Sequence, residues 1–475
     1  MNIILIVSDT FRRDHLGCYG NKWISTPNLD KFAKESIVFD QAYAASFPTV
    51  PNRMDIMTGR FSFVQYEWQP LPRDEVVLSE ILGEAGYVTM LIADTPHILE
   101  DGYNFDRGFT GWKWIRGQEA ERYMTDPIEV KLPCAPHKLR NPEGVKKYLR
   151  NVSLRQSEAD YFVARTMIEA AKWLERNYKQ EKFFLYVDTF DPHEPWDPPR
   201  WYVDRYDPNY EGEEVIYPVY GPADYLTREE LRHMRALYAG EVTMVDRWIG
   251  MLLRKIEDLG LFDNTAVIFT TDHGFYLGEH NLTGKSIITS EFHANAPLYE
   301  EVTHIPLLIR LPGQTKRGVH CSALVQPPDL TATIIELAGV EDPGTLQGRS
   351  LLPLLKGERC RWRDIAITSP TLIHGRAGAT RPTITDGEYS FIYVGFSPSE
   401  PEEKHKTRAV DGILRGLKSL GKVENELYHL PSDPQQRHNI FSERKDVAKR
   451  LHSRFVDFLR EVGISEERLR YWLKI

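Results

Sequence analysis

The sequence predicts an α/β fold, in which a mostly parallel central sheet lies between two layers of helices as an α/β/α sandwich. Short apolar runs rich in β-branched and aromatic residues recur along the first 370 residues. Helical segments lie between these runs, and strands that alternate with helices form parallel sheets. The runs are "IILIV" at Ile3, "TMLIA" at Thr89, "FFLYV" at Phe183, "AVIFTT" at Ala266 and "PLLIRL" at Pro306.

Amphipathic patterns predict the helices. Apolar residues recur every three or four positions over 78–86, 158–178 and 231–260, and the first and last of these segments end in glycine, a common helix stop. After residue 370 the pattern changes, because an Asp386–Gly387 pair between strand-like runs predicts a hairpin. A last helix is expected over 445–462. We therefore expect a large domain over 1–370 and a small α+β subdomain over 371–475.

Composition limits the classes of function. The net charge is −9, whereas nucleic-acid binders usually carry a basic surplus. The N-terminal apolar run is too short for a signal peptide, and no segment has the length of a membrane span. Four scattered cysteines form no CxxC pair, which disfavours a disulfide scaffold or a zinc ribbon. These observations predict a cytoplasmic protein that binds neither nucleic acids nor membranes.

Polar side chains stand where predicted strands end. Asp9 follows the first strand, His193 lies just after the third, and Asp272 and His273 follow the fourth. Because parallel strands present their carboxyl ends at one edge of a sheet, these side chains are expected to converge. Together with the hydroxyl of Thr49, at a predicted helix start, they indicate a metal site. Taken alone, Asp9 is better explained as a helix cap.

Five motifs in a fixed order resemble the sulfatase and phosphonate monoester hydrolase branch of the alkaline phosphatase superfamily. The resemblance covers nearly the whole chain. It implies an alkaline-phosphatase-like fold and a hydrolase that acts on a small anionic ester. The motifs are "SDTFRRDHLGCYG", "TVPNRMDIMTGR", "FDPHEPW", "TTDHGFYLGEH" and "ELYHLPSDPQQRHNI".

The resemblance also implies a set of metal ligands. By position, Asp9, Asp272 and His273 would bind the metal, and Thr49 would both bind it and attack the substrate. Thr10 stands where the family commonly has a second acid or an amide, so it is a further candidate ligand. Three oxygens and one imidazole suit Zn²⁺ or Mn²⁺ better than Ca²⁺ or Mg²⁺, and we expect one such divalent ion.

Other roles follow from the same resemblance. Arg53 would steady the nucleophile and the anion, and Lys285 would hold a substrate oxygen. His193 would protonate the leaving oxygen, since an imidazole near its ordinary pKa can donate at neutral pH. Thr95 and His97 lie in "DTPHIL", where sulfatases carry a lysine, and are the candidate substrate-binding residues.

Thr49 bears on the substrate class. Sulfatases carry a cysteine or serine at this position and oxidise it to formylglycine, and threonine is not a substrate for that modification. An ester formed on Thr49 must instead be cleaved by water in a second in-line attack. We therefore predict hydrolysis of phosphodiesters or phosphonate monoesters. The alternatives are a sulfuric ester hydrolase, a phosphoryl transferase and an inactive anion-binding homologue, and the sequence leaves open whether the chain forms homo-oligomers.

Overall fold

The computed structural model describes residues 1–288, 293–358, 360–374, 380–394 and 423–475. Its centre is an eight-stranded sheet in the order β13-β2-β12-β7-β1-β5-β3-β4. The innermost strand, β1, is completely buried, as its continuous apolar run predicts. The strands of this sheet are β1 (Asn2–Ser8), β2 (Ile37–Ala42), β3 (Val88–Ala93), β4 (Gly111–Trp114), β5 (Phe183–Thr189), β7 (Thr265–Thr270), β12 (Leu307–Arg310) and β13 (Val319–Val325).

The pairing of the strands is parallel with one exception. β1 pairs in parallel with β5 and β7, β3 with β4 and β5, and β13 with β2. β12 runs antiparallel to both β7 and β2, so the sheet is mostly parallel, as predicted. An apolar run that is buried on both faces looks the same in either direction, and its composition therefore carries no information on orientation.

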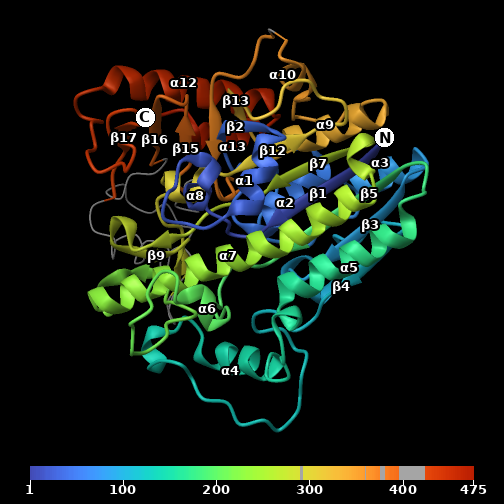
Figure 1. Cartoon of the computed structure of the whole chain (residues 1–475). Coiled ribbons are helices and arrows are strands. Elements are labelled where there is room, and N and C mark those ends of the chain that lie inside the picture. The colour runs from blue at the N-terminus through green and yellow to red at the C-terminus, as the bar shows by residue number, and fades with distance from the viewer. Residues whose placement is uncertain (289–292, 359, 375–379, 395–422) are drawn as a thin grey trace.

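Helices cover both faces of the sheet and confirm the α/β/α sandwich. Ile4 and Ile6 of β1 pack with one layer of helices, whereas Ile3, Leu5 and Val7 pack with the other. Figure 1 shows α5 and α7 of the first layer along the near face of the sheet. The first layer contains α1 (Pro27–Lys34), α5 (Phe162–Asn177) and α7 (Arg228–Asp258), and the second contains α2 (Thr49–Thr58), α3 (Leu78–Glu84), α9 (Pro328–Ala338) and α10 (Leu352–Lys356).

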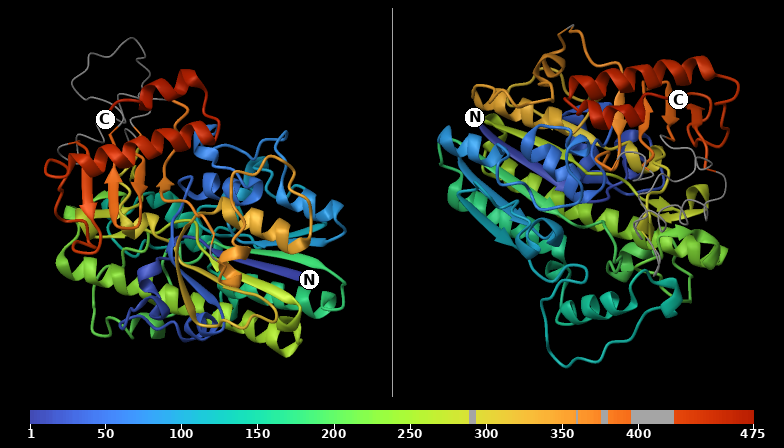
Figure 2. Two further views of the ribbon diagram at one scale, coloured as in Figure 1. Left: turned by 90° about the horizontal axis from the view of Figure 1, so that it is seen from above. Right: turned by 180° about the vertical axis from the view of Figure 1, so that it is seen from behind.

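A second, antiparallel sheet packs beside the first (Figure 2). The predicted hairpin is confirmed, since Asp386 and Gly387 connect two of its strands. The C-terminal helices α12 (Lys445–Glu461) and α13 (Glu466–Leu469) share a hydrophobic core with this sheet. One of its strands precedes residue 370, and the domain boundary expected there stays a prediction. The strands are β14 (Ala366–Thr368), β15 (Thr383–Thr385), β16 (Tyr389–Ile392) and β17 (Glu426–His429).

Further short elements lie outside the eight-stranded and four-stranded sheets. β6, β8 and β9 form a three-stranded sheet, and β10 pairs with β11. No helix within the described ranges combines the length and the apolar character needed to cross a membrane. The short elements are α4 (Pro142–Asn151), α6 (Arg200–Val203), α8 (Glu300–Thr303), β6 (Gly221–Pro222), β8 (Tyr276–Leu277), β9 (Leu282–Gly284), β10 (Ile287–Ile288) and β11 (His293–Ala294).

Candidate active site

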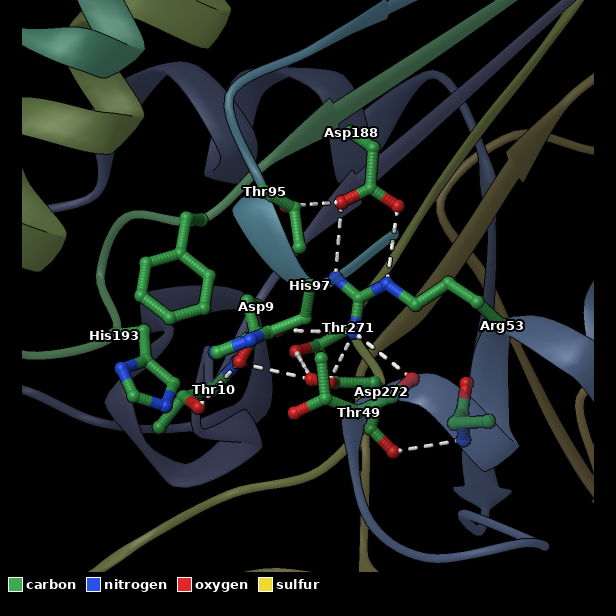
Figure 3. Close-up of polar contacts among 12 residues, drawn as sticks. Asp9, Thr10, Thr49, Arg53, Thr95, His97, Asp188, His193, Thr271 and Asp272 are labelled. Atoms are coloured by element: carbon green, nitrogen blue, oxygen red, sulfur yellow. Dashed lines mark hydrogen bonds and ion pairs between the residues drawn. The ribbon is translucent and has the colours of Figure 1, made fainter. Parts of the chain in front are cut away.

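The polar side chains that follow three strands converge at one edge of the sheet, as expected. Asp9 comes directly after β1, Asp188 lies near the end of β5, and Asp272 follows β7. Thr49 is the first residue of α2, so the helix begins at the predicted nucleophile. All four side chains are buried. Figure 3 shows them gathered around the guanidinium of Arg53.

Arg53 holds three carboxylates together. It lies one helical turn after Thr49 and is fully buried. Its Nε and Nη2 donate to the two oxygens of Asp188 at 3.1 and 3.0 Å, a bidentate pair. Its Nη1 contacts Asp272 and lies 2.9 Å from Oδ2 of Asp9. One cation among three buried carboxylates leaves this part of the site with an excess of negative charge.

The acidic side of the site fits a cation. The ligand atoms of Asp9, Asp272 and His273 lie within 4.8 Å of one another, the only such group of three in the described part of the chain. Oδ2 of Asp9 is buried and accepts no hydrogen bond despite its proximity to Arg53. An orphaned buried carboxylate oxygen carries a high desolvation cost that a metal ion would offset.

The protonation of His273 also fits a metal ligand. Its Nδ1 lies 3.0 Å from the main-chain oxygen of Gly274, which can only accept, so Nδ1 carries the hydrogen. The lone pair on Nε2 contacts Lys285 here and would coordinate a bound metal instead. Burial lowers the pKa of His273 to about 3, which keeps the ring neutral. Burial and the nearby Asp272 raise the pKa of Asp9. The pKa of Asp272 itself is lowered, because its surroundings outweigh the effect of burial, with the charge of Arg53 as the largest lowering cause.

Thr10 supports the carboxylates. Its hydroxyl donates to Oδ1 of Asp9 at 2.7 Å, and its main-chain N–H donates to Oδ1 of Asp272 at 3.0 Å. Its backbone is left-handed, with φ of 60°, a strained conformation for a β-branched residue. The turn thus orients two candidate ligands. The role of Thr10 as a ligand stays a prediction, and its hydroxyl already has a partner.

Lys285 contacts both Thr49, the predicted nucleophile, and His193, the predicted general acid. Its Nζ lies 3.3 Å from Oγ1 of Thr49, 3.0 Å from Nε2 of His193 and 3.2 Å from Nε2 of His273. An ammonium group has three hydrogens and accepts none, so these three atoms match its donors. The side chain follows β9 and is buried beside the nucleophile.

His193 is held in one orientation. Its ring stacks on Phe190 at 4.0 Å, and its Nδ1 lies 2.8 Å from the main-chain oxygen of Glu194. Because that oxygen only accepts, Nδ1 carries the hydrogen and Nε2 is directed at Lys285. Burial, followed by the charges of Lys285 and Arg140, lowers the pKa of His193. The expectation of an ordinary pKa for His193 is therefore wrong, and its imidazole ring is neutral at pH 7.

The two candidate substrate-binding residues already have protein partners. The hydroxyl of Thr95 donates to Oδ1 of Asp188 at 2.6 Å, so Thr95 helps to hold the carboxylate that holds Arg53. Nε2 of His97 lies 3.0 Å from Glu119, and the side chain of His97 is 31% exposed. Of Thr95 and His97, only His97 is exposed to solvent. Contact with the substrate stays a prediction for both residues.

Three residues of this region, Asp188, Arg140 and Glu194, had no role assigned from the sequence. Asp188 ends a buried strand, and that position was its only signal. Arg140 lies over the rings of Tyr217 and Tyr220 and pairs with Glu119 and Glu194 at 2.9 and 3.2 Å. Glu194 in turn places Oε2 at 3.1 Å from Nδ1 of His193. Asp188 and Arg140 belong to none of the five motifs, and Glu194 lies within one of them, but the main partners of all three are distant in sequence.

Comparison with known proteins gives matches along the chain. A family model described as Sulfatase matches residues 1–340. The arylsulfatase of Clostridium perfringens is 26% identical, with 98% of this chain and 94% of that protein covered. The N-acetylglucosamine-6-O-sulfatase of Bacteroides thetaiotaomicron is 24% identical, with 94% and 84% covered. The crystal structure of the phosphonate monoester hydrolase of Agrobacterium radiobacter has a TM-score of 0.72 at 20% identity, with 97% and 96% covered, a likeness of fold alone.

Proposed function

Because the chain belongs to the sulfatase family, a family of metal-dependent ester hydrolases, we propose that it hydrolyses phosphodiesters or phosphonate monoesters through Thr49. One observation carries the proposal. A threonine hydroxyl stands at the start of α2, 3.3 Å from both Lys285 and a candidate ligand nitrogen of His273. A hydroxyl is a weak nucleophile unless neighbouring groups remove its proton or stabilise the alkoxide, and both kinds of neighbour are in contact with it.

Asp9, Asp272, His273 and Thr49 would hold one divalent ion, with Zn²⁺ or Mn²⁺ as the best match to these donors. When bound, the ion would favour ionisation of the Thr49 hydroxyl and offset charge on the attacked group. The protein's own contribution is the placement of the hydroxyl. Thr49 begins a helix, and the free N–H groups and dipole of that helix N-terminus favour an anionic substrate beside it.

Lys285 provides a path for the proton. It passes a hydrogen from Nζ to Nε2 of His193 and takes the hydrogen of the Thr49 hydroxyl in exchange, so the ammonium is unchanged. His193, now protonated on both nitrogens, gives the hydrogen on Nε2 to the leaving oxygen. This route does not need an imidazolium in the resting site, which agrees with the lowered pKa of His193.

The choice of phosphorus over sulfur depends on the second step. Thr49 has a single oxygen and no route to formylglycine, so its ester is released by water attacking the transferred group. The donors that stabilise the first in-line attack then serve the second. The names of the relatives favour the second candidate, a sulfate ester hydrolase, which fits the same fold equally well.

Steady-state kinetics on one purified preparation separates the two candidates. The panel is bis(p-nitrophenyl) phosphate and a phenylphosphonate monoester against p-nitrophenyl sulfate and p-nitrophenyl phosphate, with metal content measured on the same sample. We expect the highest kcat/KM for the two monoanionic phosphorus substrates. If the sulfate ester gives the highest kcat/KM, the sulfatase candidate replaces the proposal.

A further inference from the structure

Asp55 is a buried carboxylate in the nucleophile helix α2 that no step of the mechanism uses. Its side chain is fully buried, and in the part of the chain that the structure describes it pairs with no cationic side chain. It accepts four hydrogen bonds instead. Oδ2 accepts from the main-chain N–H of Ser46 at 2.7 Å. Oδ1 accepts from the hydroxyl of Ser46 at 2.7 Å and from the N–H and hydroxyl of Ser62 at 2.7 and 2.6 Å.

These bonds join the segment that enters α2 to the segment that leaves it. Ser46 lies three residues before Thr49, and Ser62 lies four residues after the helix ends. The hydroxyl of Ser46 also accepts from the N–H of Phe63 at 2.9 Å, which strengthens the connection between the two segments. Burying a carboxylate without a counter-ion is costly unless every lone pair finds a donor, and four donors meet that need here.

Ser46 is coupled to the reacting groups through the next residue. The N–H of Phe47 donates to the main-chain oxygen of Ser369 at 3.0 Å, and the ring of Phe47 lies 5.1 Å from the ring of His273. A shift of Ser46 would therefore move Thr49 and disturb the contact with a candidate ligand at the same time. Because proximity effects are sensitive to displacements of about 1 Å, such a shift has a large kinetic consequence.

We propose that Asp55 is a positioning residue, whose carboxylate fixes the entry of α2 and thereby holds Oγ1 of Thr49 in line for attack. The proposal rests on the proposed role of Thr49 as the nucleophile. It assigns a function to a buried acidic residue that no step of the mechanism uses. A residue with this role changes kcat more than KM, since the substrate still binds but the hydroxyl is no longer aligned.

Asp55→Asn tests the proposal with a single-atom change. With the amide oxygen kept toward Ser62, the new NH₂ faces the N–H of Ser46, and two donors oppose each other. With the amide reversed, the N–H of Ser62 is the one without an acceptor. We expect kcat to fall by about 10- to 100-fold, KM to stay within about twofold, and metal content to stay unchanged. The fall should be equal for good and poor leaving groups, because attack and not departure is affected.

Asp246→Asn is the matched control. Asp246 is also a buried carboxylate that accepts main-chain N–H groups, those of Asn28 and Leu29 at 3.1 and 2.7 Å, but it joins α1 to α7. Its substitution should lower stability and leave kcat unchanged at temperatures where the protein is folded. If Asp55→Asn does not fold, Ser46→Ala is the alternative variant. It removes one hydrogen-bond donor to the carboxylate, so kcat should fall by a smaller factor while KM stays unchanged.

The outcomes of these experiments separate the possibilities. An unchanged kcat in folded Asp55→Asn overturns the positioning role. A loss of metal, or an equal fall of kcat in Asp246→Asn, overturns it as well, because it then reflects general weakening of the fold. Retained activity in Thr49→Ala would defeat the proposed nucleophile itself, whereas an inactive Thr49→Ala with a normal Asp55→Asn defeats only the inference about Asp55.

Discussion

Replacement of His193 by alanine should slow substrates according to the quality of their leaving group. Nε2 of His193 lies 3.0 Å from Nζ of Lys285, which lies 3.3 Å from Oγ1 of Thr49. The sum of these two distances is therefore the upper limit of the separation between the proposed acid and the proposed nucleophile. Both groups contact the same ammonium group, and a general acid acts when it comes within hydrogen-bond reach of the leaving oxygen.

The expected magnitude follows from general acid catalysis. A positioned proton donor contributes about 10²- to 10⁴-fold, or about 3 to 5 kcal/mol in the barrier. His193→Ala should lose that factor with an alkyl leaving group, which departs as a basic alkoxide unless it is protonated. With a p-nitrophenyl leaving group the loss should stay below about tenfold, since the departing oxygen needs little proton assistance.

The assay is kcat/KM for a series of aryl and alkyl diesters, plotted against the leaving-group pKa for wild type and variant. A steeper dependence is expected for His193→Ala. His320→Ala serves as the control, because His320 is an exposed histidine on the edge strand β13 and should leave the dependence unchanged. An equal loss across the whole series would refute the reasoning, as it would mean that His193 supports the site without delivering the proton.

Three further outcomes follow from the site and its surroundings. Asp272→Ala should take the metal content from one ion per chain to none by elemental analysis, and two tightly held ions in wild type would contradict the single-metal site. Thr49→Ala should abolish turnover with the fold retained, and intact mass should show an unmodified threonine in wild type; near-normal activity would mean that water attacks instead. Burial raises the pKa of Asp246 from 3.8 to about 6, so the folded protein binds the extra proton and stability is lost as pH rises from 4 through 6. Urea unfolding should show wild type losing about 2 kcal/mol more than Asp246→Asn between pH 4 and pH 7, and a pH-independent difference would exclude the shift.

The parts of the fold set by local pattern were predictable. The strands β1, β3, β5 and β7 and the helices α3, α7 and α12 appear where hydrophobic periodicity places them. The helix expected from residue 158 begins instead at Phe162, because Ser157 and Asp160 form a capping box around a separate 3₁₀ turn. The direction of β12 was not predictable, since it depends on the path of the chain between β7 and β12.

The candidate site was predictable where its residues belong to short sequence motifs. Asp9, Thr49 and Asp272 were placed by their motifs and by the rule that parallel strands share one carboxyl edge. Arg140 was not predictable, because its partners lie 21 and 54 positions away and reach it only through the folded loops. The same limit applies to Thr95, whose motif position was evident but whose bond to Asp188 spans 93 residues.

The balance of buried charge connects these features to the substrate. The carboxylates of Asp9, Asp188 and Asp272 face the cations Arg53 and Lys285, which leaves one net negative charge when all three acids are ionised for metal binding. Binding of a divalent ion would change this net charge from one negative to one positive. One negative charge on the substrate would then neutralise it.

A second negative charge on the substrate would have no such partner, because Thr95 is uncharged where sulfatases carry a lysine. A cation 4 Å from that charge would attract it by about 4 kcal/mol at an effective dielectric constant of about 20, so its absence costs roughly a thousandfold in kcat/KM. The same buried residues that call for a cation therefore disfavour dianionic phosphomonoesters. Under the proposed mechanism, the single oxygen of Thr49 separately favours phosphorus over sulfur. The two arguments are independent, and monoanionic phosphorus esters are the proposed class that satisfies both.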